Sequence, residues 1–317
     1  MSIRLTPPTE REFPAGRLQE RKEQLVSQIH AEPQRLQWPT RRRWPLVLGA
    51  TAAVAAAAIV ASIVLPAGDT GGASPAAAGV LHQAARTAAK APATAPPAPG
   101  QFVYTKSESM NENTAVVDNQ AINFFQTQTR EAWIGPDGSG RLRESSGRPR
   151  FVTSADRAAW VAAGKPFLTG ARTSDESFQA GGLSYLDLSK LPADPAALKQ
   201  LIVNRTIEGG PPGDAETFTI IGDLLRETYA PPAVRSALYT IASELPGVQL
   251  IGTTTDHLGR SGTAVAYDSN GVSRELIFDP QTSALLGEQT VDQNTGNVQD
   301  WTSYLSSGVV DSTTATP

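Results

Sequence analysis

The sequence predicts an α+β protein in which a single N-terminal transmembrane helix precedes a domain built on an antiparallel sheet. Two observations support this fold class. Residues 46–65 form a run of twenty uncharged residues. Beyond residue 100, helix-forming segments lie between two groups of strand-forming segments. Because the two kinds of segment do not alternate along the chain, a doubly wound parallel sheet is not expected.

The uncharged run has the length of a membrane span. At about 1.5 Å per residue, a helix of this length covers roughly 30 Å, the thickness of the hydrocarbon core of a bilayer. Nine of its residues are Leu, Ile or Val and eight are Ala, so that insertion is favoured by roughly a few kcal/mol. The alternative is an apolar helix inside a larger soluble core.

The residues on either side of the run predict its orientation. Arg35 and Arg41–Arg43 lie before it, with Trp44 at the interface, and the first charge after it is Asp69. Residues 1–44 hold nine Lys or Arg against five Asp or Glu, which leaves 18 against 26 for the remainder. The positive-inside rule therefore predicts a single-pass protein of the cell membrane, with a cytoplasmic N-terminus and an extracytoplasmic C-terminal domain. The lipid bilayer is therefore a predicted partner of this protein.

A cleaved signal sequence is the alternative. The segment 40–44 is similar to a twin-arginine signal, and 76–78 offers small residues for cleavage. A leader of 44 residues and an apolar run longer than the usual ~7–15 residues favour an uncleaved anchor instead.

The predicted organisation has five parts. They are a cytoplasmic tail (1–44), the transmembrane helix (45–66), a linker rich in Ala, Pro and Gly (67–100), the extracytoplasmic α+β domain (101–311) and a disordered tail (312–317). The linker contains a short helical segment at 80–90, and the sequence leaves open whether this helix packs on the domain. About 210 residues are enough for one domain with a sizeable core.

A short amphipathic helix is predicted in the cytoplasmic tail. Between Gly16 and Ala31, four apolar residues lie along one side of a helix: Leu18, Leu25, Val26 and Ile29. These are the candidate partner-binding residues, because such a face can dock onto a cytoplasmic protein. Since an isolated helix this short is marginally stable, the alternative is a helix that lies on the inner leaflet or frays.

The folded domain is expected to contain strands, then helices, then strands. Three segments alternate in strand fashion: 101–109, 123–134 after an Asn-rich bend, and the stretch from the turn at 135–138 through Ser146. Four segments carry helix signals: 154–163, the stretch that begins at Asp194-Pro195, 215–228 and 233–244. Four β-branched runs separated by turn residues follow: 248–255, 262–267, 272–278 and 284–291. They predict an antiparallel meander, closed by residues 300–305.

The sequence offers little for catalysis. There is no cysteine, which excludes disulfides, thiol catalysis and Cys-ligated metals. His30, His82 and His257 are far apart, and no motif joins a nucleophile to a base. We therefore expect no catalytic residues, no cofactor and no metal, and a protein that is not an enzyme; an extracytoplasmic hydrolase is a remote alternative. A net charge of −4, with no basic cluster beyond the membrane flank, argues against a nucleic-acid partner.

The large aromatic residues have two interpretations. Trp133, Trp160, Trp301, Tyr239 and Phe278 either line a ligand cavity or pack in the core. Core packing is the more common role and is favoured here. Ligand-binding residues stay unknown.

Four motifs resemble those of a known family. They are FVYTK (102–106), REAWIGPDG (130–138), IGDLLRETYAPPAVRSALY (221–239) and RELIFDPQT (274–282). Together with the tail, span and linker, they resemble an uncharacterised actinobacterial family of single-pass membrane proteins, often encoded beside extracytoplasmic-function sigma factors. The resemblance covers nearly the whole chain, but the family has no established activity or site residues to transfer.

The order of elements, with an Asp-Pro-Gln-Thr turn in the meander, is also similar to the half-barrel of periplasmic lipoprotein carriers and envelope-stress regulators. This resemblance implies a curved antiparallel sheet with helices on one face and an apolar cleft.

Two functional hypotheses follow. The first is a membrane-anchored, non-enzymatic envelope sensor or regulatory protein, whose outer domain binds a ligand or partner and whose tail contacts a cytoplasmic sigma factor. The His-Cys-Cys zinc element of many anti-sigma domains is absent. The alternative is an anchored protein that binds a lipid or another apolar envelope ligand, which needs a cavity of roughly several hundred Å³.

Overall fold

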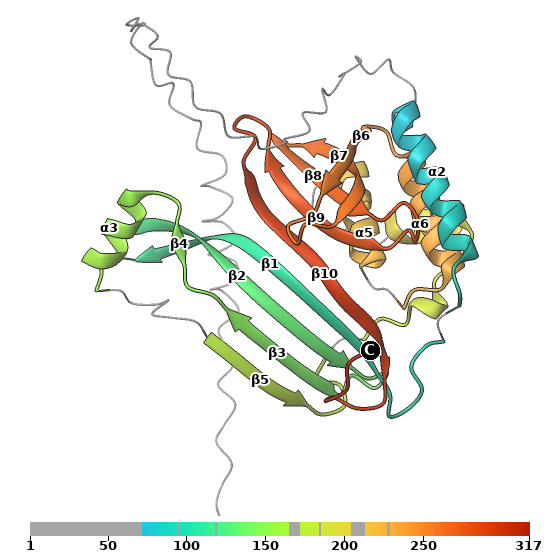
Figure 1. Ribbon diagram of the computed structural model, residues 1–317, viewed down its shortest axis with the longest axis horizontal. Helices are drawn as coiled ribbons and strands as arrows, with labels where there is room; N and C mark the ends of the chain where they lie inside the picture. The colour runs from blue at the N-terminus through green and yellow to red at the C-terminus, as the bar shows by residue number, and fades with distance from the viewer. Residues whose placement is uncertain are drawn as a thin grey trace, which may run out of the picture. The chain divides into compact units, whose positions relative to one another are not determined.

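The computed structural model describes residues 72–317, apart from 94, 118, 165–171, 184, 204–212 and 227–228 (Figure 1). The predicted cytoplasmic tail and the apolar run at 46–65 lie outside the described residues. Within the described part of the chain, no helix has both the length and the apolar character that a membrane crossing requires. The predicted transmembrane helix stays a prediction.

The described helices follow the sequence prediction closely in the middle of the domain. They are α2 (Pro75–Lys90), α3 (Ser154–Ala162), the 3-10 turn η1 (Leu188–Lys190), α4 (Pro195–Val203), α5 (Asp214–Leu225) and α6 (Pro232–Glu244). Thr153 caps α3. Its hydroxyl accepts the Asp156 backbone N–H, and the Asp156 carboxylate accepts the Thr153 backbone N–H, which forms a capping box.

The described strands form one antiparallel sheet. They are β1 (Phe102–Val117), β2 (Gln120–Ile134), β3 (Gly140–Ser146), β4 (Arg150–Phe151), β5 (Arg172–Phe178), β6 (Val248–Thr255), β7 (Ser261–Ser269), β8 (Val272–Phe278), β9 (Leu285–Asp292) and β10 (Val298–Val310). The order across the sheet is β5-β3-β2-β1-β10-β9-β8-β7-β6, with β4 paired to β2. The α+β class and the antiparallel sheet are therefore confirmed.

The bend predicted after residue 109 is wrong. Strand β1 continues to Val117 and pairs with β2 along its whole length, up to the Val117–Gln120 pair. The chain reverses beside Asn119, whose φ of 61° lies in the left-handed region that asparagine tolerates. The other asparagines of this segment lie on exposed or half-exposed arms of the hairpin, where strand pairing overrides their preference for turns.

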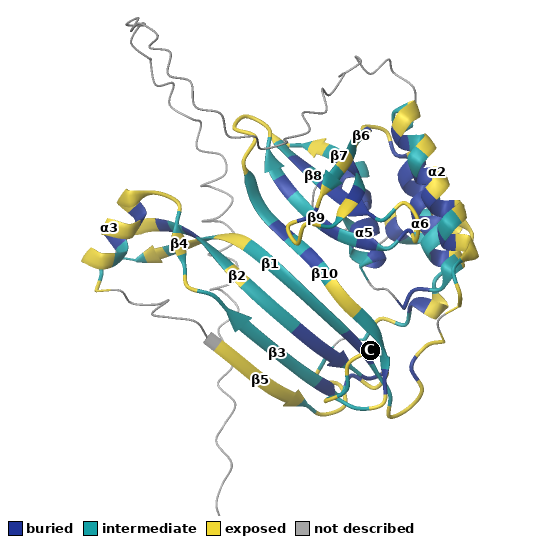
Figure 2. Cartoon of the chain, viewed as in Figure 1, coloured by how far each residue is buried: buried dark blue, intermediate teal, exposed yellow. Residues whose placement is uncertain are grey.

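Strand β5 was not predicted from the sequence. It pairs with β3 from Gly140–Phe178 to Ser146–Arg172 and lies at one edge of the strand order. Most of it is exposed (Figure 2). An exposed edge strand does not need alternating apolar residues, so its polar sequence gave no strand signal.

Helix α2 packs in the domain core, although its residues fall in the predicted linker. Its buried residues are Ala77, Leu81, Ala84, Ala85 and Ala88, and it lies along α6. The Ser74 hydroxyl accepts the Ala77 N–H, and the Ser74 N–H donates to the Val248 carbonyl of β6. The small alanine side chains allow close approach of the two helices, and the cap at Ser74 fixes where α2 begins.

One face of the sheet packs on the helices, and we call it the helix face. Val103 and Leu276 of this face belong to the same hydrophobic core as Phe218, Ile221 and Leu238, which are 0 % exposed. The buried residues of α2, α5 and α6 belong to the same core (Figure 2). This core contributes most of the apolar burial of the domain.

The opposite side of the sheet we call the Trp133 face. Strand alternation and register place Tyr104, Trp133 and Trp301 on it. A second, smaller hydrophobic cluster lies there, built from Tyr104, Trp133 and Val310 with Phe102 and Ala315 against it. None of these residues comes from a helix, and the described helices pack against residues of the helix face.

We expect Leu238→Ala in α6 to lower the free energy of unfolding by about 2–5 kcal/mol, because Leu238 is fully buried and the substitution leaves a cavity. Val161→Ala in α3 is the control. Val161 is exposed, so its loss is expected to change the free energy by less than about 0.5 kcal/mol. Urea unfolding of the full chain in detergent measures both, and equal effects would contradict the assigned core.

Candidate functional site

The residues predicted from the sequence fall into two groups. The four candidate partner-binding residues, Leu18, Leu25, Val26 and Ile29, lie outside the described residues, and their role stays a prediction. The aromatic residues are described. Trp133, Tyr239 and Phe278 are each 1 % exposed, which confirms core packing for these three.

A polar cluster with charges of both signs lies on the Trp133 face around Glu131. The Tyr104 hydroxyl donates to Oε1 of Glu131 at 2.8 Å. The Arg143 guanidinium donates to Oε2 through Nε at 2.9 Å and Nη2 at 2.5 Å. The Lys106 ammonium lies 3.9 Å from Oε1. These contacts arise because register places Lys106, Glu131 and Arg143 side by side on β1, β2 and β3.

The surroundings of Glu131 fix its charge state. Burial alone raises the pKa of its carboxyl, but the hydrogen bonds from Tyr104 and Arg143 outweigh burial, and the pKa lies below its ordinary value. Burial, together with the neighbouring carboxylate, raises the pKa of Tyr104. Glu131 is therefore an acceptor and Tyr104 a neutral donor at neutral pH.

Trp133 lies next to this cluster and contacts both arginines. Its ring centroid lies 5.0 Å from that of Tyr104, and the Arg141 and Arg143 guanidinium carbons lie 5.3 Å and 5.7 Å from it. Arg141 also forms a two-bond ion pair with Asp175 of β5. The indole face is therefore bordered by two cations held in fixed positions.

Residues 312–317 cover this end of the Trp133 face. The indole N–H of Trp133 donates to the Ala315 carbonyl at 2.7 Å, and Nη1 of Arg141 donates to the Thr313 carbonyl at 3.2 Å. The sequence predicted a disordered tail here because the residues are small and polar. The structure differs because the contacts use main-chain carbonyls, which a sequence pattern does not reveal.

The turn between β6 and β7 covers the other end of the Trp133 face. We call residues 256–260 the hairpin tip. Its His257 ring stacks on Trp301 of β10, with centroids 4.5 Å apart and an interplanar angle of 11°. His257 Nε2 lies 3.0 Å from Oε1 of Gln289, whose Nε2 donates to Glu275 at 2.8 Å. Burial raises the pKa of Glu275, the hydrogen bond from Gln289 opposes this rise, and the negative charge of Asp268 adds to it.

A half-exposed band lies between the two covers. It contains Lys106, Glu108, Met110 and Thr129 of β1 and β2. Beside it lies the Ser303 hydroxyl, which is buried and has no hydrogen-bond partner in the part of the chain that the structure describes. The band therefore presents charged groups and a flexible apolar side chain on one surface, and the Ser303 hydroxyl lies buried beneath it.

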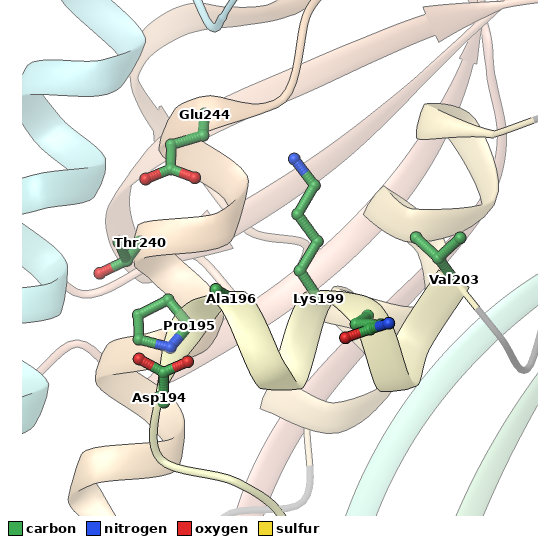
Figure 3. A pocket seen from close by; sticks show the side chains of 8 residues that line it. Asp194, Pro195, Ala196, Lys199, Val203, Thr240 and Glu244 are labelled. Atoms are coloured by element: carbon green, nitrogen blue, oxygen red, sulfur yellow. The ribbon is translucent and has the colours of Figure 1, made fainter.

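A second surface feature lies between α4 and α6. It is a depression of about 490 Å³ lined by Asp194, Pro195, Ala196, Lys199, Gln200, Val203, Thr240 and Glu244. Figure 3 shows the side chains of Lys199 from α4 and Glu244 from α6 beside it. Its lining is mostly exposed, with charged groups of both signs, so it does not have the enclosed apolar character of a lipid site.

Among the described residues, no three His, Asp or Glu side chains come together as metal ligands do. The expectations of no metal, no cofactor and no catalysis stay predictions.

The residues of the Trp133 face were not predicted as a site. Tyr104 and Lys106 lie in the motif at 102–106, and Glu131 and Trp133 lie in the motif at 130–138. Within each pair the residues are two apart, which puts them on one side of their strand. That spacing was the available signal, but the pairing of β1 with β2 is needed to bring the two pairs together.

Comparison with known proteins finds few similarities. No family model matches the chain, and no curated protein matches it. Among solved structures, the crystal structure of MucB is similar, with 12 % sequence identity and a TM-score of 0.27. The match covers 77 % of this chain and 61 % of MucB, which is less than two thirds of that protein.

At neutral pH, we expect the free energy of unfolding of the unaltered chain to exceed that of the Glu131→Gln variant. We expect this difference to shrink as the pH falls. The pKa of Glu131 is lower in the folded chain than its ordinary 4.5. The ionised Glu131 carboxylate therefore contributes its full stabilisation at pH values above 4.5. This stabilisation is lost as the pH falls through the pKa of Glu131 in the folded chain. Urea unfolding from about pH 7 to about pH 3 measures it.

Glu108→Gln is the control for this titration. Glu108 lies on the same face but in no ion pair among the described residues. A difference for Glu131→Gln that grows toward low pH would contradict the assigned network.

Proposed function

We propose that the chain is a membrane-anchored, non-enzymatic envelope sensor or regulatory protein whose folded domain binds a protein partner through the Trp133 face. One observation carries the proposal. On this face, which the described helices leave uncovered, the half-exposed side chains of Lys106 and Glu108 lie beside a carboxylate held by two cations. A buried tryptophan bordered by arginines lies next to them, under residues 312–317. Tryptophan and arginine are enriched where proteins bind each other, and fixed charges of both signs set the orientation of a partner.

The proposed anchor is the apolar run at 46–65, with the arginines before it on the cytoplasmic side. The proposed inner contact is a cytoplasmic sigma factor that binds the apolar side of the tail helix. Support comes from the spacing of Leu18, Leu25, Val26 and Ile29 and from the family resemblance. In this arrangement, a partner bound outside the membrane changes the availability of the tail inside it.

The alternative, an anchored protein that binds a lipid or another apolar molecule, has less support. It needs an apolar cavity between the helices and the sheet. Phe218, Ile221 and Leu238 occupy that interior and are fully buried. The depression between α4 and α6 is open to solvent and includes the charged side chains of Asp194, Lys199 and Glu244.

We expect an extracytoplasmic-function sigma factor of the same cell to co-purify with the full chain in detergent. We expect Leu25→Asp to lower the recovered amount by about tenfold or more, because it places a charge on the apolar side of the helix that would contact the sigma factor. Gln24→Asp places the same charge on the opposite side and is the control. Equal recovery with both variants, or no recovery with the unaltered chain, would contradict the inner contact.

We expect Glu108→Lys to abolish the response of a reporter transcribed by that sigma factor, because the substitution reverses a charge in the half-exposed band of the Trp133 face. Glu176→Lys on β5 is the control, because strand register places Glu176 on the helix face of the sheet and its side chain is exposed. Both variants are checked for unchanged thermal unfolding. An identical response from the two variants would exclude the Trp133 face as the outer site.

A further inference from the structure

We infer that residues 312–317 form a displaceable strap over a site for a short, uncharged segment of small residues that a protein partner presents. The inference rests on the proposed function, because it specifies the chemistry by which a partner contacts the Trp133 face. Three features of the strap support it: how it is held, what fits beneath it and how little else fixes it.

The site holds the strap by its main chain. Trp133 donates to the carbonyl of Ala315, and Arg141 donates to the carbonyl of Thr313. The strap turns at this point, since the Ala315 N–H donates to the Ser312 carbonyl at 3.3 Å. Every residue has a carbonyl oxygen, so the two donors recognise the path of a backbone and not a particular side chain. A partner segment that makes the same turn satisfies them equally well.

Small residues of the strap lie against the sheet, one on the aromatic cluster and one on a glycine of β10. The Ala315 side chain packs against the cluster of Tyr104, Trp133 and Val310. Pro317 lies against Gly308, where a Cβ atom would come within 2.9 Å of the Pro317 Cγ. A glycine at this position of β10 therefore makes room for the chain that crosses it. Ala315 is half-buried against this cluster, so a charged side chain in place of its methyl group would lose part of its hydration there.

Few other contacts fix the strap. At its base, Nε2 of Gln101 donates to the Asp311 carboxylate at 2.8 Å. The hydroxyls of Ser312 and Thr314 lie 3.1 Å apart and bond to each other. If the strap leaves, the buried Trp133 N–H loses its acceptor, which is unfavourable unless another carbonyl replaces it. Exchange for a partner's segment is therefore favoured over an empty site.

The test uses the full chain in nanodiscs and a fluorescein-labelled peptide with the sequence of residues 312–317. Fluorescence anisotropy measures its affinity for the unaltered chain, for a chain that lacks residues 312–317 and for Ala315→Asp. In the unaltered chain the strap covers the site, and the apparent Kd for the peptide rises by the reciprocal of the fraction of chains in which the site is uncovered. We therefore expect both altered chains to bind the peptide about tenfold more tightly than the unaltered chain, or better. Ala315→Asp keeps the length of the chain, so the test does not depend on the truncated form.

A second pair of variants tests the role of the indole. In the Ala315→Asp chain, Trp133→Phe keeps a ring but removes the N–H, and we expect about fivefold weaker peptide binding, the loss of one hydrogen bond. Trp160→Phe in α3 is the control and should leave the affinity unchanged. A peptide in which aspartate replaces the alanine should not bind.

Three outcomes would overturn the strap. The first is equal peptide affinity for the unaltered and altered chains. The second is no binding of the peptide to either altered chain at a peptide concentration of about 1 mM, which is the effective concentration of a tethered segment. The third is a dimer that dissociates when residues 312–317 are removed, which would show exchange of the segment between copies. The Glu108→Lys reporter result is independent of all three, so a failed strap is distinguishable from a failed partner site.

Discussion

The pairing of β1 with β10 is the constraint on which the rest of the described domain depends. In the strand order, β1 joins β2, β3 and β5 to the meander β6–β10. The pair Phe102–Val310 brings together the two ends of the domain, and such a non-local pairing carries a large cost in loop-closure entropy. Burial on both faces offsets this cost, because Val103 joins the core of the helix face and Val310 joins the cluster of the Trp133 face.

This pairing also decides where the candidate site lies. Since β10 ends opposite Phe102, residues 311–317 leave the sheet beside Tyr104 and Trp133. The register of β1 with β2 then places the Lys106–Glu131 pair one step further along the same face. The strap and the charged cluster are therefore neighbours because of strand register, and neither depends on the helices on the opposite face.

The sequence predicted local features of the fold better than those of the site. Strand β8 was predicted at 272–278, because its apolar and β-branched residues and the turns beside it are local signals. Strand β10 was predicted only at 300–305, since the run Ser306-Ser307-Gly308 that follows carries no strand signal. The residues from 306 onward form a strand because β1 pairs with them. The contacts of Glu131 could not be predicted for a similar reason, because its partners Tyr104 and Arg143 come from two other strands. The strap was unpredictable from its residue types, because its contacts are made by carbonyl groups.

The two covers of the Trp133 face differ in how firmly they are held. In the hairpin tip, the buried Asp256 carboxylate pairs with Arg260, whose guanidinium also donates to the carbonyls of Leu286 and Tyr304. Removing one partner of a buried ion pair leaves an uncompensated charge, which costs several kcal/mol. The strap at the other end has no such pair and is held by neutral carbonyls. A partner that approaches the Trp133 face therefore gains access at the strap, while the hairpin tip stays fixed as the opposite wall.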